Sequence, residues 1–225
     1  MASTHKRPVS LAASMLAVFS LASCGLFGDE ENSDQDPETS ATEPALAGDG
    51  GGFTLTSPTD ISPDGQSDVP HVLIYSDPAC PACAQMEAAF HSDLERWLTE
   101  GAITLEYRSV AFVSDYSNDA ANAFACMAEE SPENYFAYLG EVTAERVTVD
   151  ELSEDELTER AGRQGADIGE CISNGTFDAF VEDTTQTALD EGGIEGTPTV
   201  IVDGEEVPGD EFMNIDQHIS AAINE

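Results

Sequence analysis

Residues 71–83 read HVLIYSDPACPAC, and they join two kinds of pattern. His71 to Tyr75 form a nearly continuous apolar run, which is typical of a strand buried inside a sheet. Beyond residue 79, apolar side chains recur at three- and four-residue steps, as on one helix face: Cys83, Met86, Phe90, Leu94 and Trp97. Gly101 then acts as a stop signal. The pattern predicts a strand followed by a helix that begins at the Cys80-Pro81-Ala82-Cys83 motif.

A Cys-x-x-Cys motif at the start of a helix has a specific chemistry. The helix N-terminus presents free N–H groups and partial positive charge, which stabilise a thiolate on Cys80. Cys83 lies one turn later and is close enough to form a disulfide, so the pair can accept and release a mixed disulfide. Two alternatives are a structural disulfide and half of a zinc site. Zinc needs two more ligands, and His71, His91 and His218 show no paired spacing, so we expect no metal site and no cofactor.

The rest of the chain predicts an α/β domain with a long helical block. Ile103, Leu105 and Tyr107 alternate with polar residues, as in a second strand. Helical patterns then follow to about residue 190: one capped by Asn118 or Asp119, one opened by Ser131-Pro132, one with the capping pair Ser153 and Glu156, and one carrying Phe177 and Phe180. Strand signals return at residues 199–202. A hairpin turn at Asp203-Gly204, a return strand at Glu206-Val207 and an amphipathic helix over residues 212–223 end the chain.

A second motif, Gly196-Thr197-Pro198-Thr199, stands just before the last hairpin. A proline at the start of a buried strand cannot donate a hydrogen bond to the sheet. Such a proline needs a special geometry, commonly a cis peptide bond.

Together these motifs resemble the DsbA-like branch of the thioredoxin fold. The likeness rests on residues 75–83, on residues 196–200 ahead of Asp203-Gly204, and on the helical block between them. It covers roughly residues 53–225. It implies an α/β thioredoxin-like fold, with a helical insertion at about residues 115–190 between an N-terminal strand-helix-strand half and a C-terminal hairpin-helix half.

The resemblance also implies roles for individual residues. Cys80 would be the attacking or attacked thiol and Cys83 the resolving one. Pro198 would be cis and lie against this pair, and Thr197 would offer backbone hydrogen bonds to a substrate chain. Strong oxidants of this family usually carry histidine inside the motif, whereas this chain has Pro81-Ala82. Because the side chain of neither residue can donate to Cys80, we expect a Cys80 pKa nearer about 7 than about 3.5. We also expect this protein to be a weaker oxidant than the family members that carry histidine in the motif.

The N-terminus has the pattern of an export signal. A basic start at residues 5–7 precedes a short apolar run, which ends in Leu21-Ala22-Ser23-Cys24 and looks like a bacterial lipobox. We expect a lipoprotein signal peptide over residues 1–23 and lipidation of Cys24, although an ordinary signal peptide or a short anchor fits the run as well. Residues 25–52 contain eight acidic and no basic side chains, which predicts a disordered acidic tether over residues 24–52.

The five cysteines fit an oxidising compartment. With Cys24 lipidated, the other four allow three pairings. The adjacent Cys80 and Cys83 favour a bond with each other, which leaves Cys126 with Cys171 as a structural disulfide.

The charge excludes some partners. The chain has 45 acidic and seven basic residues, for a net charge of −38. An acidic protein gains no counterion release from nucleic acid or from an anionic membrane surface, so neither is expected to bind it. Adaptation to salty surroundings and genomic composition bias both explain such a composition.

The function expected from these observations is disulfide exchange outside the cytoplasm. The protein would be anchored to the cell membrane by the lipid on Cys24 and would act on exported client proteins, with a membrane redox partner that the sequence does not identify. One alternative is a reductase or isomerase fed by a membrane electron donor. Another is a non-catalytic binding lipoprotein with a structural Cys80–Cys83 disulfide.

Overall fold

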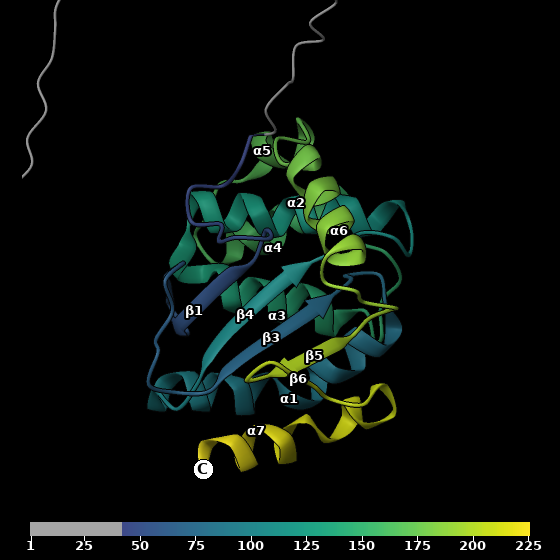
Figure 1. Ribbon diagram of the computed structural model, residues 1–225. Coiled ribbons are helices and arrows are strands. Elements are labelled where there is room, and N and C mark those ends of the chain that lie inside the picture. The colour runs from purple at the N-terminus through teal and green to yellow at the C-terminus, as the bar shows by residue number, and fades with distance from the viewer. Residues whose placement is uncertain (1–41) are drawn as a thin grey trace, which may run out of the picture. The chain divides into compact units, whose positions relative to one another are not determined.

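Residues 42–225 are described by the computed structural model, and within them six strands form one mixed sheet (Figure 1). The strands are β1 (Phe53–Ser57), β2 (Asp60–Ile61), β3 (His71–Ser76), β4 (Thr104–Ser109), β5 (Thr199–Val202) and β6 (Glu205–Glu206). Their order is β2-β1-β4-β3-β5-β6, with β3 and β4 parallel and all other neighbours antiparallel. The predicted signal peptide, Cys24 and the first part of the predicted tether lie outside the described residues.

Helices cover both faces of this sheet. They are α1 (Pro81–Glu100), α2 (Asp115–Glu130), α3 (Tyr135–Glu145), α4 (Glu154–Arg163), α5 (Gly169–Ser173), α6 (Asp178–Asp190) and α7 (Ile215–Ile223), with 3-10 turns at Pro132–Asn134 and Gly209–Asn214. In Figure 1, α1 and α3 lie behind the sheet and α6 in front of it. The block from α2 to α6 is inserted between β4 and β5. The predicted thioredoxin-like α/β fold with a helical insertion is confirmed.

Strand β3 lies near the middle of the sheet and is buried on both faces. Val72 and Ile74 belong to the main hydrophobic core, whereas Leu73 and Tyr75 pack in a second cluster that includes Ala188 of α6. A strand covered on both faces needs apolar residues at consecutive positions, which explains the unbroken run in the sequence. The end of β3, where the Cys80 motif begins, is therefore held on a rigid central element.

Some element boundaries differ from the prediction. Helix α2 begins at Asp115 rather than near Asn118 or Asp119. Its N-cap is Ser114, whose backbone N–H donates to Ser117 Oγ at 3.1 Å. The sequence analysis also did not predict β1, β2 or α5. β2 has two residues and α5 has five, which is too short for a hydrophobic period to appear.

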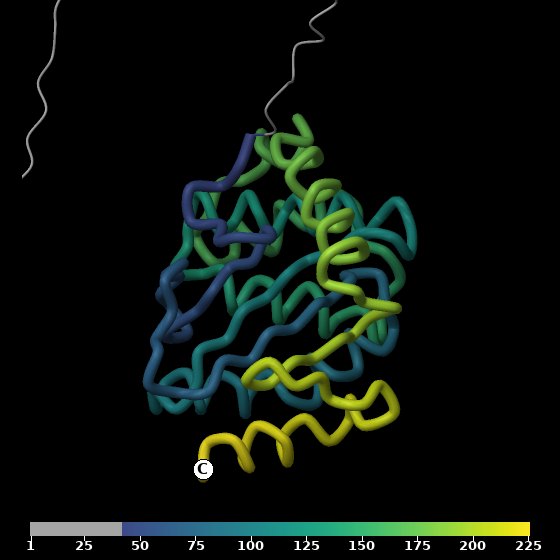
Figure 2. Tube along the Cα trace, viewed as in Figure 1, coloured from purple at the N-terminus to yellow at the C-terminus, as the bar shows by residue number. Residues whose placement is uncertain are grey.

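The folded domain begins before residue 53, where the predicted tether ended. Pro44 is buried, and the Ala45 N–H donates to Glu129 of α2 at 2.7 Å. Gly51 has a φ of +78° and lies so close to Thr184 of α6 that a Cβ at this position would overlap its side chain. Figure 2 shows this purple segment running along the insertion. The glycines that predicted flexibility serve close packing instead.

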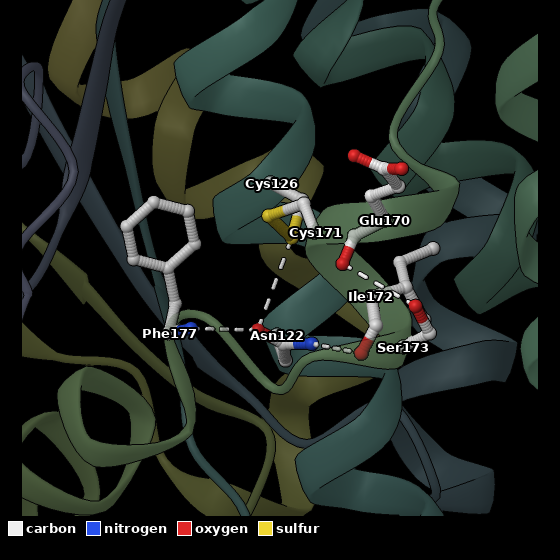
Figure 3. The surroundings of a disulfide bond; sticks show 7 residues. All are labelled: Asn122, Cys126, Glu170, Cys171, Ile172, Ser173 and Phe177. Atoms are coloured by element: carbon white, nitrogen blue, oxygen red, sulfur yellow. Dashed lines mark hydrogen bonds between the residues drawn. A yellow bond between two sulfur atoms is a disulfide. The ribbon is translucent and has the colours of Figure 1, made fainter.

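A disulfide joins two helices of the insertion (Figure 3). Cys126 of α2 and Cys171 of α5 are bonded, with their Cα atoms 5.9 Å apart. One turn before Cys126, the Asn122 side chain donates to the Ile172 carbonyl at 3.3 Å and accepts from the Phe177 N–H at 2.9 Å. The bond and the amide together fasten α2 to α5 and to the start of α6.

Candidate active site

The Cys80 motif joins the end of β3 to the start of α1. Cys80 is the N-cap of α1 and has extended backbone, and Pro81 is the first helical residue, a position that proline favours. Both thiols are free, but Cys80 is 8 % exposed whereas Cys83 is fully buried. Only the Cys80 sulfur is placed where a partner molecule could reach it.

The motif around Pro198 lies next to the Cys80 motif in the structure, although Thr197 follows Cys80 by 117 positions in the sequence. The Thr197–Pro198 peptide bond is cis. The Cys80 thiol donates to the Thr197 carbonyl at 3.2 Å. The structure thus brings together Cys80, Cys83, Thr197 and Pro198, four residues that the sequence analysis singled out. Cys126 and Cys171 form a separate pair in the insertion.

The surroundings of Cys80 favour its thiolate. The pKa of Cys80 is lowered from 9.0 to about 5, chiefly by a hydrogen bond from the Cys83 thiol. Burial acts in the opposite direction, and hydrogen bonds from the Thr197 side chain and from the backbone of Cys83 and Ala82 lower the pKa further. The pKa is therefore lower than the value near 7 expected from the sequence, because the largest contribution comes from the Cys83 thiol, which the sequence analysis did not count as a hydrogen-bond donor to Cys80.

Cys83 has the opposite tendency. Burial, together with the hydrogen bond to Cys80 and its charge, raises the pKa of Cys83 far above its usual value. Hydrogen bonds from the Ser76 side chain and the Asp77 backbone offset only part of this effect. At neutral pH the reduced pair therefore carries one negative charge, and this charge is on the more accessible sulfur.

These opposite shifts predict the pH dependence of alkylation. In the reduced protein, the rate at which iodoacetamide modifies Cys80 should be half-maximal near pH 5, because the thiolate is the nucleophile. Since the lowered pKa belongs to the folded reduced state, this state should gain stability as the pH rises from about 5 toward 9, and lose it as the pH falls through 5. Replacing Cys83 with alanine should raise the midpoint. A wild-type midpoint above pH 8 would contradict this assignment.

Asp77 holds the motif in place and was not singled out from the sequence. Its buried carboxylate accepts from the Ala79 N–H at 2.8 Å and the Ser117 hydroxyl at 2.7 Å, and from the N–H groups of Phe112 and Val113 at 2.9 and 3.1 Å. One side chain thus ties the motif to the β4–α2 loop and to the start of α2. An aspartate before a proline is a common turn residue, so its sequence position carried no further signal.

A polar network lies in the core beneath the dithiol. Glu87 of α1 is 1 % exposed, accepts a hydrogen bond from the Tyr107 hydroxyl at 2.8 Å and contacts His91 Nδ1 at 2.6 Å. Burial lowers the pKa of His91, but the hydrogen bond and charge of Glu87 outweigh it, and the pKa is raised. Glu87 and His91 follow Cys83 at intervals of four residues. An acidic side chain at this spacing on an apolar helix face was the signal that could have revealed the network.

The described residues contain neither a candidate metal site nor a helix that could span a membrane. Over residues 42–225, no three histidine, cysteine, aspartate or glutamate side chains are grouped so that they could hold a metal ion. In the same part of the chain, every helix is too short or too polar to cross a membrane.

The fold and the dithiol beside a cis-proline define the class of protein, which is a DsbA-like thiol-disulfide oxidoreductase. A family model described as thioredoxin matches residues 56–224, and the chain belongs to this family. No curated protein sequence matches the chain.

Solved structures with the same fold cover most of the chain. Reduced DsbG from Mycobacterium tuberculosis, a disulfide bond oxidoreductase, is 26% identical, with a TM-score of 0.64 over 80% of this chain and 91% of that one. Oxidised DsbA from the same organism is 24% identical, with a TM-score of 0.62 over 77% and 93%. BdbD from Bacillus subtilis, at 17% identity, has a TM-score of 0.63 over 82% and 98% and shows the likeness of fold alone.

Proposed function

We propose that this protein exchanges disulfides with exported proteins outside the cytoplasm, with Cys80 forming the mixed disulfide and Cys83 resolving it. One observation carries the proposal. The Cys80 thiol has a pKa lowered to about 5, sits at the N-terminus of α1 and lies 3.2 Å from the Thr197 carbonyl, next to cis-Pro198. A structural disulfide needs neither a stabilised thiolate nor a neighbouring backbone edge, which argues against a non-catalytic binding lipoprotein.

In the oxidising direction, a client thiolate attacks the Cys80 sulfur of the Cys80–Cys83 disulfide. Cys83 leaves and takes up a proton, and the client is joined to Cys80. A second client thiolate then attacks the client sulfur of this mixed disulfide, so the client gains a disulfide and Cys80 leaves as a thiolate. Stabilising that thiolate favours the reduced enzyme and hence oxidation of the client. The pKa of about 5 lies between the values of about 7 and about 3.5 that mark weak and strong oxidants.

Two features near Cys80 suit an unfolded client. The backbone of the half-buried Thr197 offers an edge where an extended chain can form hydrogen bonds. On the Asp77 side, Phe112 and Val113 are 43% and 48% exposed, although both are apolar. Exposed apolar side chains on the loop that Asp77 ties to the motif fit the exposed apolar segments of chains that have not yet folded.

The N-terminal segment supports attachment to a membrane. Residues 1–23 would be the signal peptide, and Cys24 would carry the lipid. Residues 25–41 contain six acidic and no basic side chains, and they remain the part of the proposed tether that precedes the buried Pro44. A membrane redox partner would then reoxidise the Cys80–Cys83 pair. Electron flow in the reverse direction, as in a reductase or isomerase, would use the same site.

The experiment is a trap in cells. In a Cys83→Ala variant the Cys80 thiolate can still attack a client disulfide, and one client sulfur then leaves as a thiol. Because Cys83 is missing, it cannot release the client from Cys80, so clients should stay bound in the membrane fraction, where mass spectrometry identifies them. Adding Cys24→Ser should move the same complexes out of the membrane fraction. A Cys80→Ala/Cys83→Ala variant is the control for non-specific capture.

The arms of this experiment separate the two parts of the proposal. If only cytoplasmic proteins are trapped, or none, the proposed exchange with exported clients is wrong. If Cys24→Ser leaves the complexes in the membrane fraction, the lipid anchor is wrong, whatever is trapped.

A further inference from the structure

A groove runs beside the dithiol on the side of the cis-proline. It has a volume of about 540 Å³ and lies between the inner residue of the motif, the segment before β5 and the 3-10 turn before α7. Its lining includes Ala82, Glu195, Thr197, Pro198, Glu206 and Phe212. Because Thr197 also contacts Cys80, a client chain joined to Cys80 has this groove next to it.

The groove carries negative charge without a cation to balance it. Glu195 and Glu206 are its only ionisable lining residues, and both are exposed. Within residues 42–225, neither carboxylate accepts a hydrogen bond or forms an ion pair with a side chain. The nearby His218 is bonded to Glu211 through Nε2, at 2.8 Å.

The positive charges of the described chain are all used elsewhere. Four of its arginines form ion pairs with acidic side chains: Arg96, Arg108, Arg160 and Arg163. Arg146 lies at the end of α3 and donates to the Val149 carbonyl at 2.8 Å. None of the five arginines within residues 42–225 is therefore placed to neutralise Glu195 and Glu206, and the client can supply the cation in the groove.

We propose that Glu195 and Glu206 are specificity-determining residues, which favour client segments that carry lysine or arginine within a few residues of the reacting cysteine. This inference rests on the proposed function. In an extended client segment, alternate side chains point to the same side, about 7 Å apart, so a residue near the cysteine reaches along the groove. Opposite charges on the exposed edge of a binding groove affect the encounter rate and the choice of partner more than the final affinity.

The test uses short peptides with one cysteine, flanked on both sides by lysine, glutamine or glutamate. The oxidised full-length protein in non-ionic detergent is mixed with each peptide, and exchange is followed by acid quench and mass spectrometry. At low salt, the lysine peptide should react about tenfold faster than the glutamate peptide. In a Glu195→Gln/Glu206→Gln variant, this ratio should fall to about threefold. The remaining preference would come from the net negative charge of the protein as a whole.

A matched control separates the groove from the overall charge. Glu130→Gln/Glu133→Gln removes the same two charges at the far end of α2, from exposed positions, and should leave the tenfold ratio unchanged. In about 1 M salt, screening should reduce the ratio for all variants. Equal loss of the ratio in both double variants would overturn the role of the groove.

The glutamine peptide distinguishes the two levels of the proposal. If it exchanges readily but the wild-type protein shows no preference between lysine and glutamate peptides, the inference about the groove is wrong and the proposed function stands. If no peptide exchanges at all, the proposed function fails and the inference fails with it.

Discussion

Replacing Cys80 with serine should reduce the rate of disulfide exchange to that of the buffer alone. Cys80 is the sulfur that lies beside Thr197 and the one whose thiolate is stabilised, with a pKa lowered to about 5. A hydroxyl cannot form the mixed disulfide, and the remaining Cys83 is fully buried with a raised pKa. The measurement is the rate of oxidation of a reduced, unfolded test protein by the pre-oxidised enzyme.

Two variants show that this loss belongs to Cys80. Cys83→Ser should also lose turnover, but its intact Cys80 should still attack a disulfide-bonded form of the test protein, so that one sulfur of that disulfide joins Cys80 and the other leaves as a thiol. A Cys126→Ala/Cys171→Ala variant should keep full exchange at a temperature where it is folded. Residual exchange in Cys80→Ser well above the buffer rate would mean that another thiol starts the reaction.

Removing the disulfide between Cys126 and Cys171 should lower the free energy of unfolding by about 4 kcal/mol. The bond closes a loop with a sequence separation of 45, and the chain-entropy model assigns this amount to the restriction of the unfolded chain. The double alanine variant is compared with wild type in urea unfolding, with Cys80 and Cys83 kept in the same redox state.

The cross-link has to be separated from the packing of its sulfur atoms. Reduced wild-type protein keeps both side chains and lacks only the bond, so it should lose most of the same free energy as the alanine variant. The bond should also resist a mild reductant that opens Cys80–Cys83, because Cys126 is fully buried. A loss below about 1 kcal/mol in both samples would show that the bond adds little to this fold.

Local patterns were enough where an element is specified by its own residues. The apolar run of β3, the helical spacing after Cys83 and the capping pair of α4 were all readable, because each depends on neighbours within a few positions. The turn at Asp203-Gly204 is another case. Both residues have positive φ, 48° and 84°, which is the geometry that this pair favours in a two-residue hairpin.

The sequence could not predict contacts between residues that are far apart along the chain. Gly51 looked like part of a flexible linker, but Thr184 of α6 leaves no room for a side chain there. Asp77 looked like a turn residue, but three segments donate to its carboxylate. The same holds for the buried Glu87, whose partner Tyr107 comes from β4.

The chemistry of the site divides in the same way. The Cys80 motif and the residues around Pro198 are two short patterns, and their identity as a dithiol and a special proline followed from the residues alone. The pKa of Cys80 could not be derived from the sequence, since it depends on how deeply Cys83 is buried and where the Cys83 thiol points. The groove could not be predicted from the sequence either. Ala82, Glu195 and Glu206 become neighbours only when β5 pairs with β3 and places the C-terminal segment beside α1. Hydrogen-bond geometry and burial are properties of the packed chain, and no local pattern encodes them.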